Sequence, residues 1–452
     1  MATPLHVVVL PWSAFGHMIP YLNLALALAK AGVRVTYVST PRNIQRLPQI
    51  PRSLTALVEY KELPMPKVKE LAEGAESTLD LTFDQIEYLK VAYDLLEEPF
   101  TQIIVDQSPD WIITDFASYW APKIADKYGA SHIYFSAFSA ATRCFFALNN
   151  AKSNPENLAT KPSSITFPSS VAYRKYEVTG LHVGFYGNNA SRISDAERVR
   201  KIHEGCRAVA IRSCREFEGE YIDLYKSLSQ KPFIPVGLLP PEQLNESENE
   251  LGVFKWLDEQ ACRSVVFVGF GSESKLTKEE VYEIAYGLEM SKLPFLWALQ
   301  RPVWADEETE ALPMGFRDRV VGKGFVCLGW APQQKILAHP SVGGCLLHSG
   351  WGSVIESLQY GHCLVVLPFI TDQGLNARLL GDKGLAIEVD RREDGSFNRD
   401  DIARALMKAM VEEEGKKIRA SAMNVAQVFG DRKLHESYID ELVEYMKVAG
   451  RK

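Results

Sequence analysis

The chain has 452 residues, which suggests two or three domains with ample cores. Apolar residues make up 46% and charged residues 24%, the balance of an ordinary soluble globular protein. The net charge of −7 and the lack of a basic stripe exclude a typical nucleic-acid partner, although a small polyanion could still bind through backbone amides.

Cysteine usage and hydropathy favour a cytoplasmic location. The seven cysteines are odd in number and form no C-x-x-C pair, which argues against a disulfide framework or a zinc site. The N-terminal MATPLHVVVLPW lacks a basic region and a long apolar region, so we expect no signal peptide. No apolar run reaches the roughly 18 residues of a membrane span. A monomer is the default expectation.

The first elements alternate between apolar runs and amphipathic stretches. Residues 6–11 predict a buried strand, 14–32 a helix that ends at Gly32, and 33–40 the next strand. This β-α-β order with a glycine stop predicts a parallel sheet. The same pattern continues with strands at 109–115 and 132–138 and a helix at 120–129.

The second half repeats this alternation, so we expect two parallel-sheet domains. Residues 231–252 are rich in Pro, Gly and acidic residues, which predicts a linker, or alternatively a surface loop inside one domain. The predicted strands are 263–272, 294–300, 324–330, 343–348 and 363–369, and the predicted helices are 278–291, 399–415 and a final one around 436–448. The predicted divisions are 1–235, a linker at 236–252, 253–430, and a C-terminal helix at 431–452.

Polar residues follow many of these strands, where ligands of open α/β sheets bind. Their clustering at strand ends predicts a binding cleft. The residues are His17, Asp115, Ser272, Trp330, His348, Ser353, Asp372 and Gln373.

His17 and Asp115 are candidates for a proton-transfer pair. The positive end of the predicted helix disfavours an imidazolium at His17, so the ring should be neutral and able to act as a general base. A carboxylate on the other ring nitrogen would orient it, and Asp115 ends a neighbouring strand. Alternatively, His17 is structural and Asp115 caps the following helix.

Small residues in LLHSGWGSVIE (346–356) surround a predicted helix start. Free amides and hydroxyls there suit a diphosphate, and the alternative is a tight turn with caps. The chain has no G-x-x-x-x-G-K-[ST] and no G-x-G-x-x-G, which opposes a P-loop and a nicotinamide-dependent oxidoreductase. It also lacks Asp-x-Asp, so we expect no metal, with helix ends and His348 meeting the phosphate charge.

Residues 330–373 resemble the 44-residue signature box of plant family 1 UDP-glycosyltransferases. The matching motifs are W-A-P-Q at 330–333, H-P-x-V-G-G at 339–344, H-x-G-W-x-S at 348–353, Glu356, and D-Q at 372–373. The resemblance covers the whole chain and implies an α/β protein of the GT-B fold. Two facing Rossmann-like domains would hold the active site in the cleft between them, with 1–235 binding the acceptor and 253–430 binding the UDP-sugar. The helix at 431–452 would pack back on the first domain.

The resemblance also implies a role for each site residue. His17 would deprotonate the acceptor hydroxyl and Asp115 would stabilise the imidazolium. An inverting displacement would follow, with the UDP-sugar as co-substrate and no cofactor or metal. The implied UDP-sugar-binding residues are Trp330 and Ala331 for uracil, Gln333 and Glu356 for ribose, His348, Gly352, Ser353 and Ser272 for diphosphate, and Trp351, Asp372 and Gln373 for the sugar.

Two positions depart from the family pattern. The family usually has H-C-G-W-N-S where this chain has Ser349 and Gly352, so a phosphate contact of the Asn is lost or replaced. The terminal Gln373 favours glucose by analogy. The stretch 39–43 (Ser-Thr-Pro-Arg-Asn) resembles the subset that adds glucose or rhamnose to a sugar already on a flavonoid, terpenoid or steroid.

We therefore expect an enzyme that moves glucose, or rhamnose, from UDP to a small plant metabolite or its glycoside. The alternatives are a UDP-rhamnose-specific enzyme and a silent nucleotide-sugar binding protein, which the intact His17 and Asp115 oppose. Aromatic residues predicted to line the acceptor pocket, or else to pack in the core, are Phe138, Phe145, Phe146, Phe185 and Tyr186.

Overall fold

The computed structural model describes residues 4–241, 251–305 and 307–450. The chain divides into two compact units: 1–155, 179–239 and 432–452 form the first, and 156–178 and 240–431 the second. The predicted division placed 156–178 in the first domain, whereas the structure groups this stretch with the second unit. Side chains of the stretch bond to Thr371, Arg378 and Asp382 of that unit. Predicted linker residues 242–250 lie outside the described residues, and Val236 and Leu238 are buried in the first unit.

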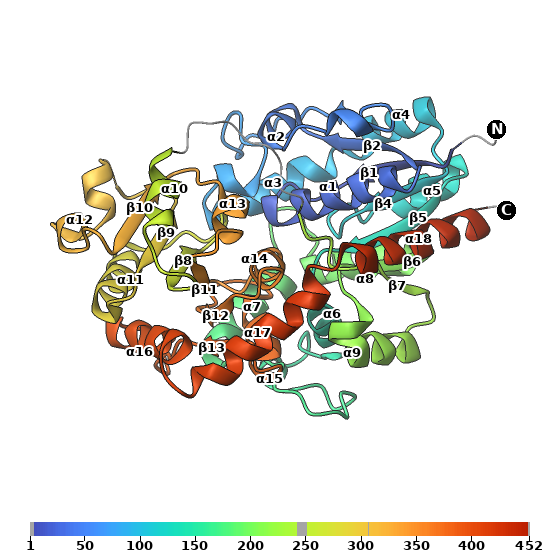
Figure 1. The fold of residues 1–452 in the computed structure, drawn as a ribbon. Helices are drawn as coiled ribbons and strands as arrows, with labels where there is room; N and C mark the ends of the chain where they lie inside the picture. The colour runs from blue at the N-terminus through green and yellow to red at the C-terminus, as the bar shows by residue number, and fades with distance from the viewer. Residues whose placement is uncertain (1–3, 242–250, 306, 451–452) are drawn as a thin grey trace. The chain divides into compact units, whose positions relative to one another are not determined.

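The first unit contains a parallel seven-stranded sheet in the order β3-β2-β1-β4-β5-β6-β7, counted over the described residues (Figure 1). Alternate side chains of these apolar strands enter cores on both faces. The strands are β1 (His6–Leu10), β2 (Arg34–Ser39), β3 (Val58–Glu62), β4 (Trp111–Thr114), β5 (Ser131–Ser136), β6 (Ala208–Ile211) and β7 (Phe233–Pro235).

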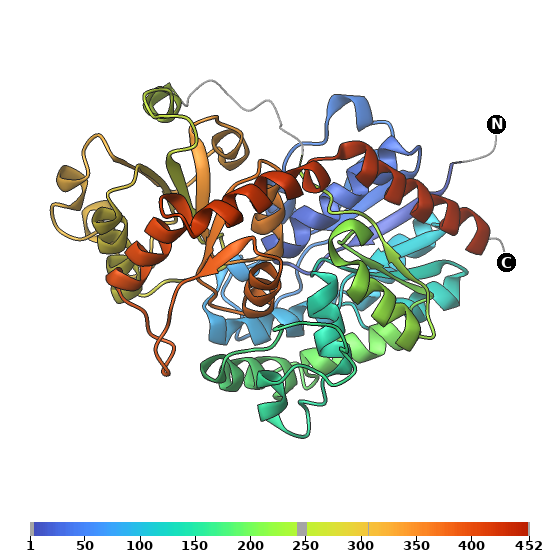
Figure 2. The same cartoon turned by 60° about the horizontal axis from the view of Figure 1, so that its bottom comes forward.

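Helices cover both faces of this sheet. The last helix, α18, returns from the end of the chain to the first unit (Figures 1 and 2), and its Ile439, Leu442 and Met446 are buried in the same core cluster as Val7 and Trp111. The helices are α1 (Phe15–Lys30), α2 (Pro41–Arg46), α3 (Ile86–Asp94), α4 (Glu97–Gln107), α5 (Ala121–Tyr128), α6 (Ala140–Leu148), α8 (Asp195–Gly205), α9 (Arg215–Leu228) and α18 (Arg432–Ala449), with α7 (Lys175–Tyr186) running from the second unit's share of the chain into the first.

The described part of the second unit contains a parallel six-stranded sheet in the order β10-β9-β8-β11-β12-β13. Capping boxes fix the starts of two helices, at Thr277 with Glu280 and at Asn398 with Asp401. The strands are β8 (Val265–Gly269), β9 (Phe295–Leu299), β10 (Gly324–Leu328), β11 (Val342–Leu347), β12 (Cys363–Val366) and β13 (Ala386–Glu388). The helices are α10 (Leu251–Asp258), α11 (Lys278–Ser291), α12 (Phe316–Arg319), α13 (Gln333–Leu337), α14 (Trp351–Leu358), α15 (Gln373–Asp382), α16 (Arg399–Met410) and α17 (Gly415–Phe429).

Strand order reverses once in each sheet, and each reversal positions the candidate residues of its own unit. In the first unit the chain departs in opposite directions from β1 and β4, and in the second from β8 and β11. Loops that follow such a pair diverge and leave room for a ligand. His17 and Asp115 follow the first pair, and Ser272 and His348 follow the second.

The predicted α/β class and every predicted strand are confirmed. The strands that sequence reasoning missed are β3, β6, β7 and β13, most of them short or partly polar. Within the described residues, none of the helices is both long enough and apolar enough to cross a bilayer.

Burial lowers the pKa of several histidines. The pKa of His362 falls to about 4, first through desolvation, while its hydrogen bond to Leu337 O raises it. The Nε2–Leu337 O distance is 2.7 Å, so Nε2 carries the proton and the ring is neutral. Desolvation likewise lowers the pKa of His132 to about 3 and of His203 and His348 to about 4.

We expect the protein to lose stability as the pH falls from about 6.5 towards 4, because the unfolded chain then binds protons that the buried rings do not. His362→Gln keeps a donor for Leu337 O and removes one such ring. Its Tm should therefore fall less between about pH 7 and pH 5 than the wild-type Tm. His339→Gln, at a partly exposed ring, is the control. An unchanged fall in His362→Gln would contradict this account.

Candidate functional site

His17 and Asp115 meet at the strand-order reversal of the first unit. His17 lies in the first turn of α1, and Asp115 directly follows β4. The distance from His17 Nδ1 to Asp115 Oδ2 is 2.7 Å, and the exposed fractions of the two side chains are 15% and 2%. The predicted pair is therefore present, and its imidazole retains contact with solvent.

The carboxylate of Asp115 is fixed by the backbone. Oδ1 accepts a hydrogen bond from Phe116 N at 2.7 Å, and Oδ2 accepts one from Trp12 N at 3.2 Å. Asp115 therefore bonds the β1–α1 loop and His17, and it does not cap α5, which begins only at Ala121. An ionised carboxylate only accepts, so Nδ1 of His17 carries the proton and Nε2 presents a lone pair.

Two aromatic rings hold the imidazole in place. Phe138 lies edge-on to His17 with centroids 5.5 Å apart, and Phe116 is tilted at 5.8 Å. Sequence reasoning placed Phe138 near the acceptor but missed Phe116. Its position directly after Asp115 was the available signal.

His348 occupies the corresponding reversal in the second unit. It follows β11 and is 8% exposed. Desolvation lowers its pKa to about 4, outweighing a hydrogen bond with the Gly269 backbone. A Cβ on Gly350 would lie 2.5 Å from His348 Nε2, and one on Gly271 would lie 2.9 Å from Cε1. Both glycines are thus required for the ring to fit, and the ring is neutral above about pH 4.

Helix α14 begins directly after this histidine. Its N-cap is Gly350, which has no side chain to cap the first-turn amides of Trp351, Gly352 and Ser353. An N-terminus of this kind has N–H groups and a partial positive charge available to an anion. The small residues of the H-x-G-W-x-S stretch therefore form a helix start suited to a phosphate.

An exposed indole and an amide–carboxylate pair lie on the elements beside α14. Trp330 follows β10 and is 68% exposed, which leaves a flat surface for stacking. Ala331 is its half-buried neighbour. Gln333 Nε2 donates to Glu356 Oε2 at 2.5 Å, which joins the first turn of α13 to α14.

The turn before α15 is held by its own side chains. Gln373 Oε1 accepts from Phe369 N at 2.8 Å and from Ile370 N at 3.0 Å. Asp372 Oδ2 accepts from Asn376 Nδ2 at 2.7 Å. The side-chain oxygen of Gln373 is occupied, so a sugar contact from Gln373 would have to use Nε2. Asn376, four residues after Asp372 on one helix, was missed from sequence although that spacing was a signal.

Known proteins resemble this chain over its full length. Residues 246–441 match the family described as UDP-glucoronosyl and UDP-glucosyl transferase. UDP-glycosyltransferase 91C1 of Arabidopsis thaliana is 40% identical over 99% of this chain and 97% of its own length. The soyasaponin III rhamnosyltransferase of Glycine max is 38% identical over 98% of this chain and 96% of its own.

The chain belongs to the plant family 1 UDP-glycosyltransferases. The solved structure of Arabidopsis thaliana UGT89C1 complexed with UDP-L-rhamnose is similar, with a TM-score of 0.77, 26% identity, and coverage of 98% of this chain and 100% of that one. The protein is therefore a UDP-glycosyltransferase of the GT-B fold. The resemblance of the signature box is confirmed.

The structure buries all three side chains that the family resemblance assigns to the sugar, which are Trp351, Asp372 and Gln373. Trp351 is 3% exposed and packs edge-on against Phe429 with centroids 6.5 Å apart. Any ligand contact from Trp351 must therefore come from its backbone. Ser272, Gly352 and Ser353 are half-buried.

The predicted acceptor aromatics divide by burial. Phe145 is fully buried and packs edge-on behind Phe146, which places it in the core of the first unit. Phe146, Phe185 and Tyr186 are half-buried, and the centroid separations are 4.6 Å for Phe146–Phe185 and 4.9 Å for Phe185–Tyr186. These three form one aromatic cluster between α6 and α7.

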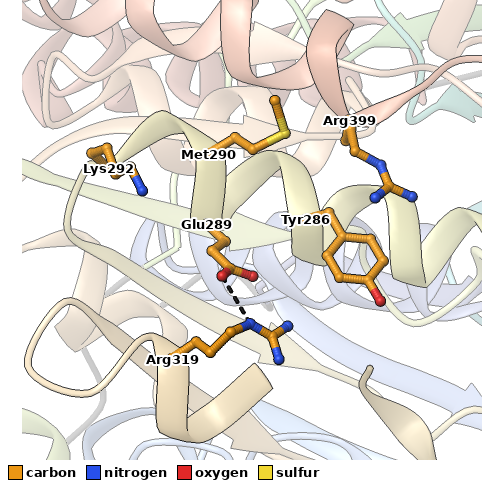
Figure 3. Close-up of a pocket in the computed structure, with 6 residues that line it drawn as sticks. All are labelled: Tyr286, Glu289, Met290, Lys292, Arg319 and Arg399. Atoms are coloured by element: carbon orange, nitrogen blue, oxygen red, sulfur yellow. Dashed lines mark hydrogen bonds and ion pairs between the residues drawn. The ribbon is translucent and has the colours of Figure 1, made fainter. Parts of the chain in front are cut away.

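A separate hollow of about 330 Å³ in the second unit contains no predicted site residue (Figure 3). Its cations are largely neutralised, since Arg319 Nε lies 2.8 Å from Glu289 and Arg399 pairs with Glu283. Its lining residues are Tyr286, Glu289, Met290, Lys292, Arg319 and Arg399. Among the described residues there is also no group of three or more His, Cys, Asp or Glu that could hold a metal.

Gly350→Ala should weaken UDP binding at least about tenfold, because the added Cβ displaces the buried imidazole of His348. Gly381→Ala is the matched control, since a Cβ there meets nothing within 4 Å. Isothermal titration with UDP tests both variants. Equal affinity in Gly350→Ala and the wild type would show that the fit around His348 does not govern nucleotide binding.

Proposed function

We propose that the protein transfers glucose or rhamnose from UDP to a hydroxyl of a small plant metabolite or its glycoside, with inversion at the anomeric carbon. The observation that carries the proposal is the 2.7 Å bond from His17 Nδ1 to Asp115 Oδ2. This bond leaves Nε2 as the basic nitrogen of a neutral ring. Both donors are supported by name, because the matching family is described as UDP-glucoronosyl and UDP-glucosyl transferase and the Glycine max relative is a rhamnosyltransferase.

In the proposed reaction, Nε2 of His17 takes the proton of the acceptor hydroxyl. The oxygen bonds to the anomeric carbon of the sugar as the bond from that carbon to the β-phosphate oxygen breaks. Asp115 stabilises the imidazolium that forms, since its carboxylate is bonded to Nδ1 and fixed by Trp12 N and Phe116 N. The reaction is one displacement, with no covalent enzyme intermediate.

Negative charge grows on the β-phosphate of UDP as it leaves. The amides of the first turn of α14, the neutral ring of His348 and the hydroxyls of Ser353 and Ser272 are proposed to receive it. Trp330 is proposed to stack on uracil, with Ala331 at its edge, and Gln333 with Glu356 to hold the ribose. The sugar is assigned to Asp372, to Gln373 through Nε2, and to the backbone of Trp351.

The acceptor is proposed to be a flavonoid, terpenoid or steroid, as an aglycone or as a glycoside. The cluster of Phe146, Phe185 and Tyr186 supports an aromatic or polycyclic acceptor, because flat apolar rings pack well against such side chains. Phe138, which touches His17, is the aromatic residue best placed to guide the hydroxyl to the base. We propose that the protein works in the cytoplasm, as a monomer and without a metal.

His17→Ala should lower kcat by roughly 10²–10⁴-fold, because the proposed base is lost. UDP affinity should stay unchanged, because the residues proposed to bind UDP are not altered. Asp115→Asn should lower kcat by roughly the same factor, because an amide can hold the His17 imidazole in the wrong tautomer. His339→Ala and Asp258→Asn, which remove another His–Asp pair at 3.2 Å, are the matched controls and should keep full activity. Full activity in His17→Ala would remove the proposed base.

Mass spectrometry of products tests the donor and the acceptor. Purified protein is mixed with a flavonol, its 3-O-glucoside and a triterpenoid or steroidal glycoside, each with UDP-glucose or UDP-rhamnose, with and without EDTA. We expect a hexose or deoxyhexose increment that EDTA does not reduce. A deoxyhexose mass increment that appears only with glycoside acceptors would identify a branch-forming rhamnosyltransferase. UDP-sugar binding without any product would favour the silent binding protein.

A further inference from the structure

A stretch of chain from the first half of the sequence forms part of the second unit. Residues 156–178 follow α6 and include the first residues of α7, yet they group with 240–431. Ser170 binds Asp382 at the end of α15, with N to Oδ2 at 2.7 Å and Oγ to Oδ1 at 2.6 Å. Sequence reasoning did not predict this attachment.

The same stretch contacts the start of α15 through a buried ion pair. Glu177 Oε2 lies 2.6 Å from Arg378 NH2, and the two side chains are 14% and 3% exposed. Arg378 NH1 also donates to Gly374 O at 2.8 Å. A Cβ on Gly374 would lie 2.4 Å from Glu177 Oε1, so the glycine allows the carboxylate to approach the first turn of the helix. A carboxylate is favoured at that end of a helix.

Tyr173 makes the contact closest to the proposed sugar residues. Its hydroxyl donates to Thr371 O at 2.9 Å, and the side chain is 4% exposed. Thr371 has φ of +49°, a conformation that a β-branched residue rarely adopts. Such a residue persists only where neighbouring contacts hold it. Tyr173 provides one of these contacts from a buried, fixed position.

Thr371 directly precedes Asp372 and Gln373. Gln373 closes the turn onto Phe369 N and Ile370 N, so a change of backbone at 371 would redirect both proposed sugar residues. Uracil, ribose and phosphate are assigned to other loops.

We propose that Tyr173 is a positioning residue for the donor sugar: by holding Thr371 in its left-handed conformation it sets the orientation of Asp372 and Gln373. It acts on the sugar of the UDP-sugar and has no role in binding UDP itself. This inference rests on the proposed assignment of Asp372 and Gln373 to the sugar.

The test compares UDP with UDP-glucose and UDP-rhamnose binding in Tyr173→Phe by isothermal titration without acceptor. Loss of one hydrogen bond of about 1 kcal/mol should weaken the preferred UDP-sugar about fivefold. UDP affinity should stay within about twofold, and the KM for the donor should rise with the dissociation constant. Tyr282→Phe loses an exposed bond of 3.3 Å to Glu310 O in the same unit and should change neither affinity.

A second substitution separates positioning from a general loss of packing. Asn tolerates the left-handed conformation better than Thr, so Thr371→Asn in the Tyr173→Phe background should recover part of the UDP-sugar affinity. Recovery supports the proposal. An equal loss of UDP and UDP-sugar affinity, no loss of either, or no recovery in the double variant would overturn it.

The binding assay requires no acceptor, so its outcome is separate from that of the proposed reaction. If the wild type forms no product with the acceptors tested, the selective loss of UDP-sugar affinity in Tyr173→Phe still supports the positioning role. If the wild type forms product and Tyr173→Phe binds every ligand normally, only the positioning role is overturned.

Discussion

Parallel pairing of the strands is the constraint on which the candidate residues of each unit depend. Each described strand pair in the two sheets is parallel, so every strand ends at the same edge as its neighbours. Each sheet reverses its strand order once, between β1 and β4 and between β8 and β11. The loops that carry His17 and Asp115, and those that carry Gly271 and His348, are adjacent for this reason although they are far apart in sequence.

The two imidazoles have different surroundings. At His17 the fixed carboxylate of Asp115 accepts a hydrogen bond from Nδ1–H, which leaves Nε2 as the basic nitrogen of the neutral ring and stabilises the charged form once it arises. At His348 desolvation disfavours the charged form, and no carboxylate is bonded to compensate. The first ring is therefore suited to accept a proton during turnover. The second is suited to remain neutral beside a phosphate, which is the division of roles that the proposed glycosyl transfer from UDP would need.

Sequence reasoning found nine of the thirteen described strands, the His17–Asp115 pair and the signature box, because each depends on local pattern or on the end of a strand. It missed contacts between residues that are distant in sequence. Tyr173 and Thr371 are 198 positions apart, and no periodicity marks the bond between them. The burial of Trp351 against Phe429 and of Phe145 behind Phe146 could not be read from the sequence for a different reason. An aromatic residue looks the same in sequence whether it lines a pocket or fills a core.

The departures from the family motif gain a physical meaning from the bonds around α15. Ser349, where the family usually has Cys, has φ of +61°, and its Oγ donates to Gln373 O at 2.8 Å, a stronger bond than a thiol would make. Asn376 Nδ2 donates to Ser349 O at 3.0 Å as well as to Asp372. Gly352 lacks the side chain that the family usually has beside the phosphate. The bonds of Ser349 and Asn376 join the loop before α14, which is proposed to bind phosphate, to the turn before α15, which is proposed to bind the sugar. In the proposed reaction, the choice of donor sugar would depend on the conformation of these two bonded loops more than on the identity of Gln373 alone. Tyr173 contributes to that conformation by holding Thr371 in its left-handed backbone conformation.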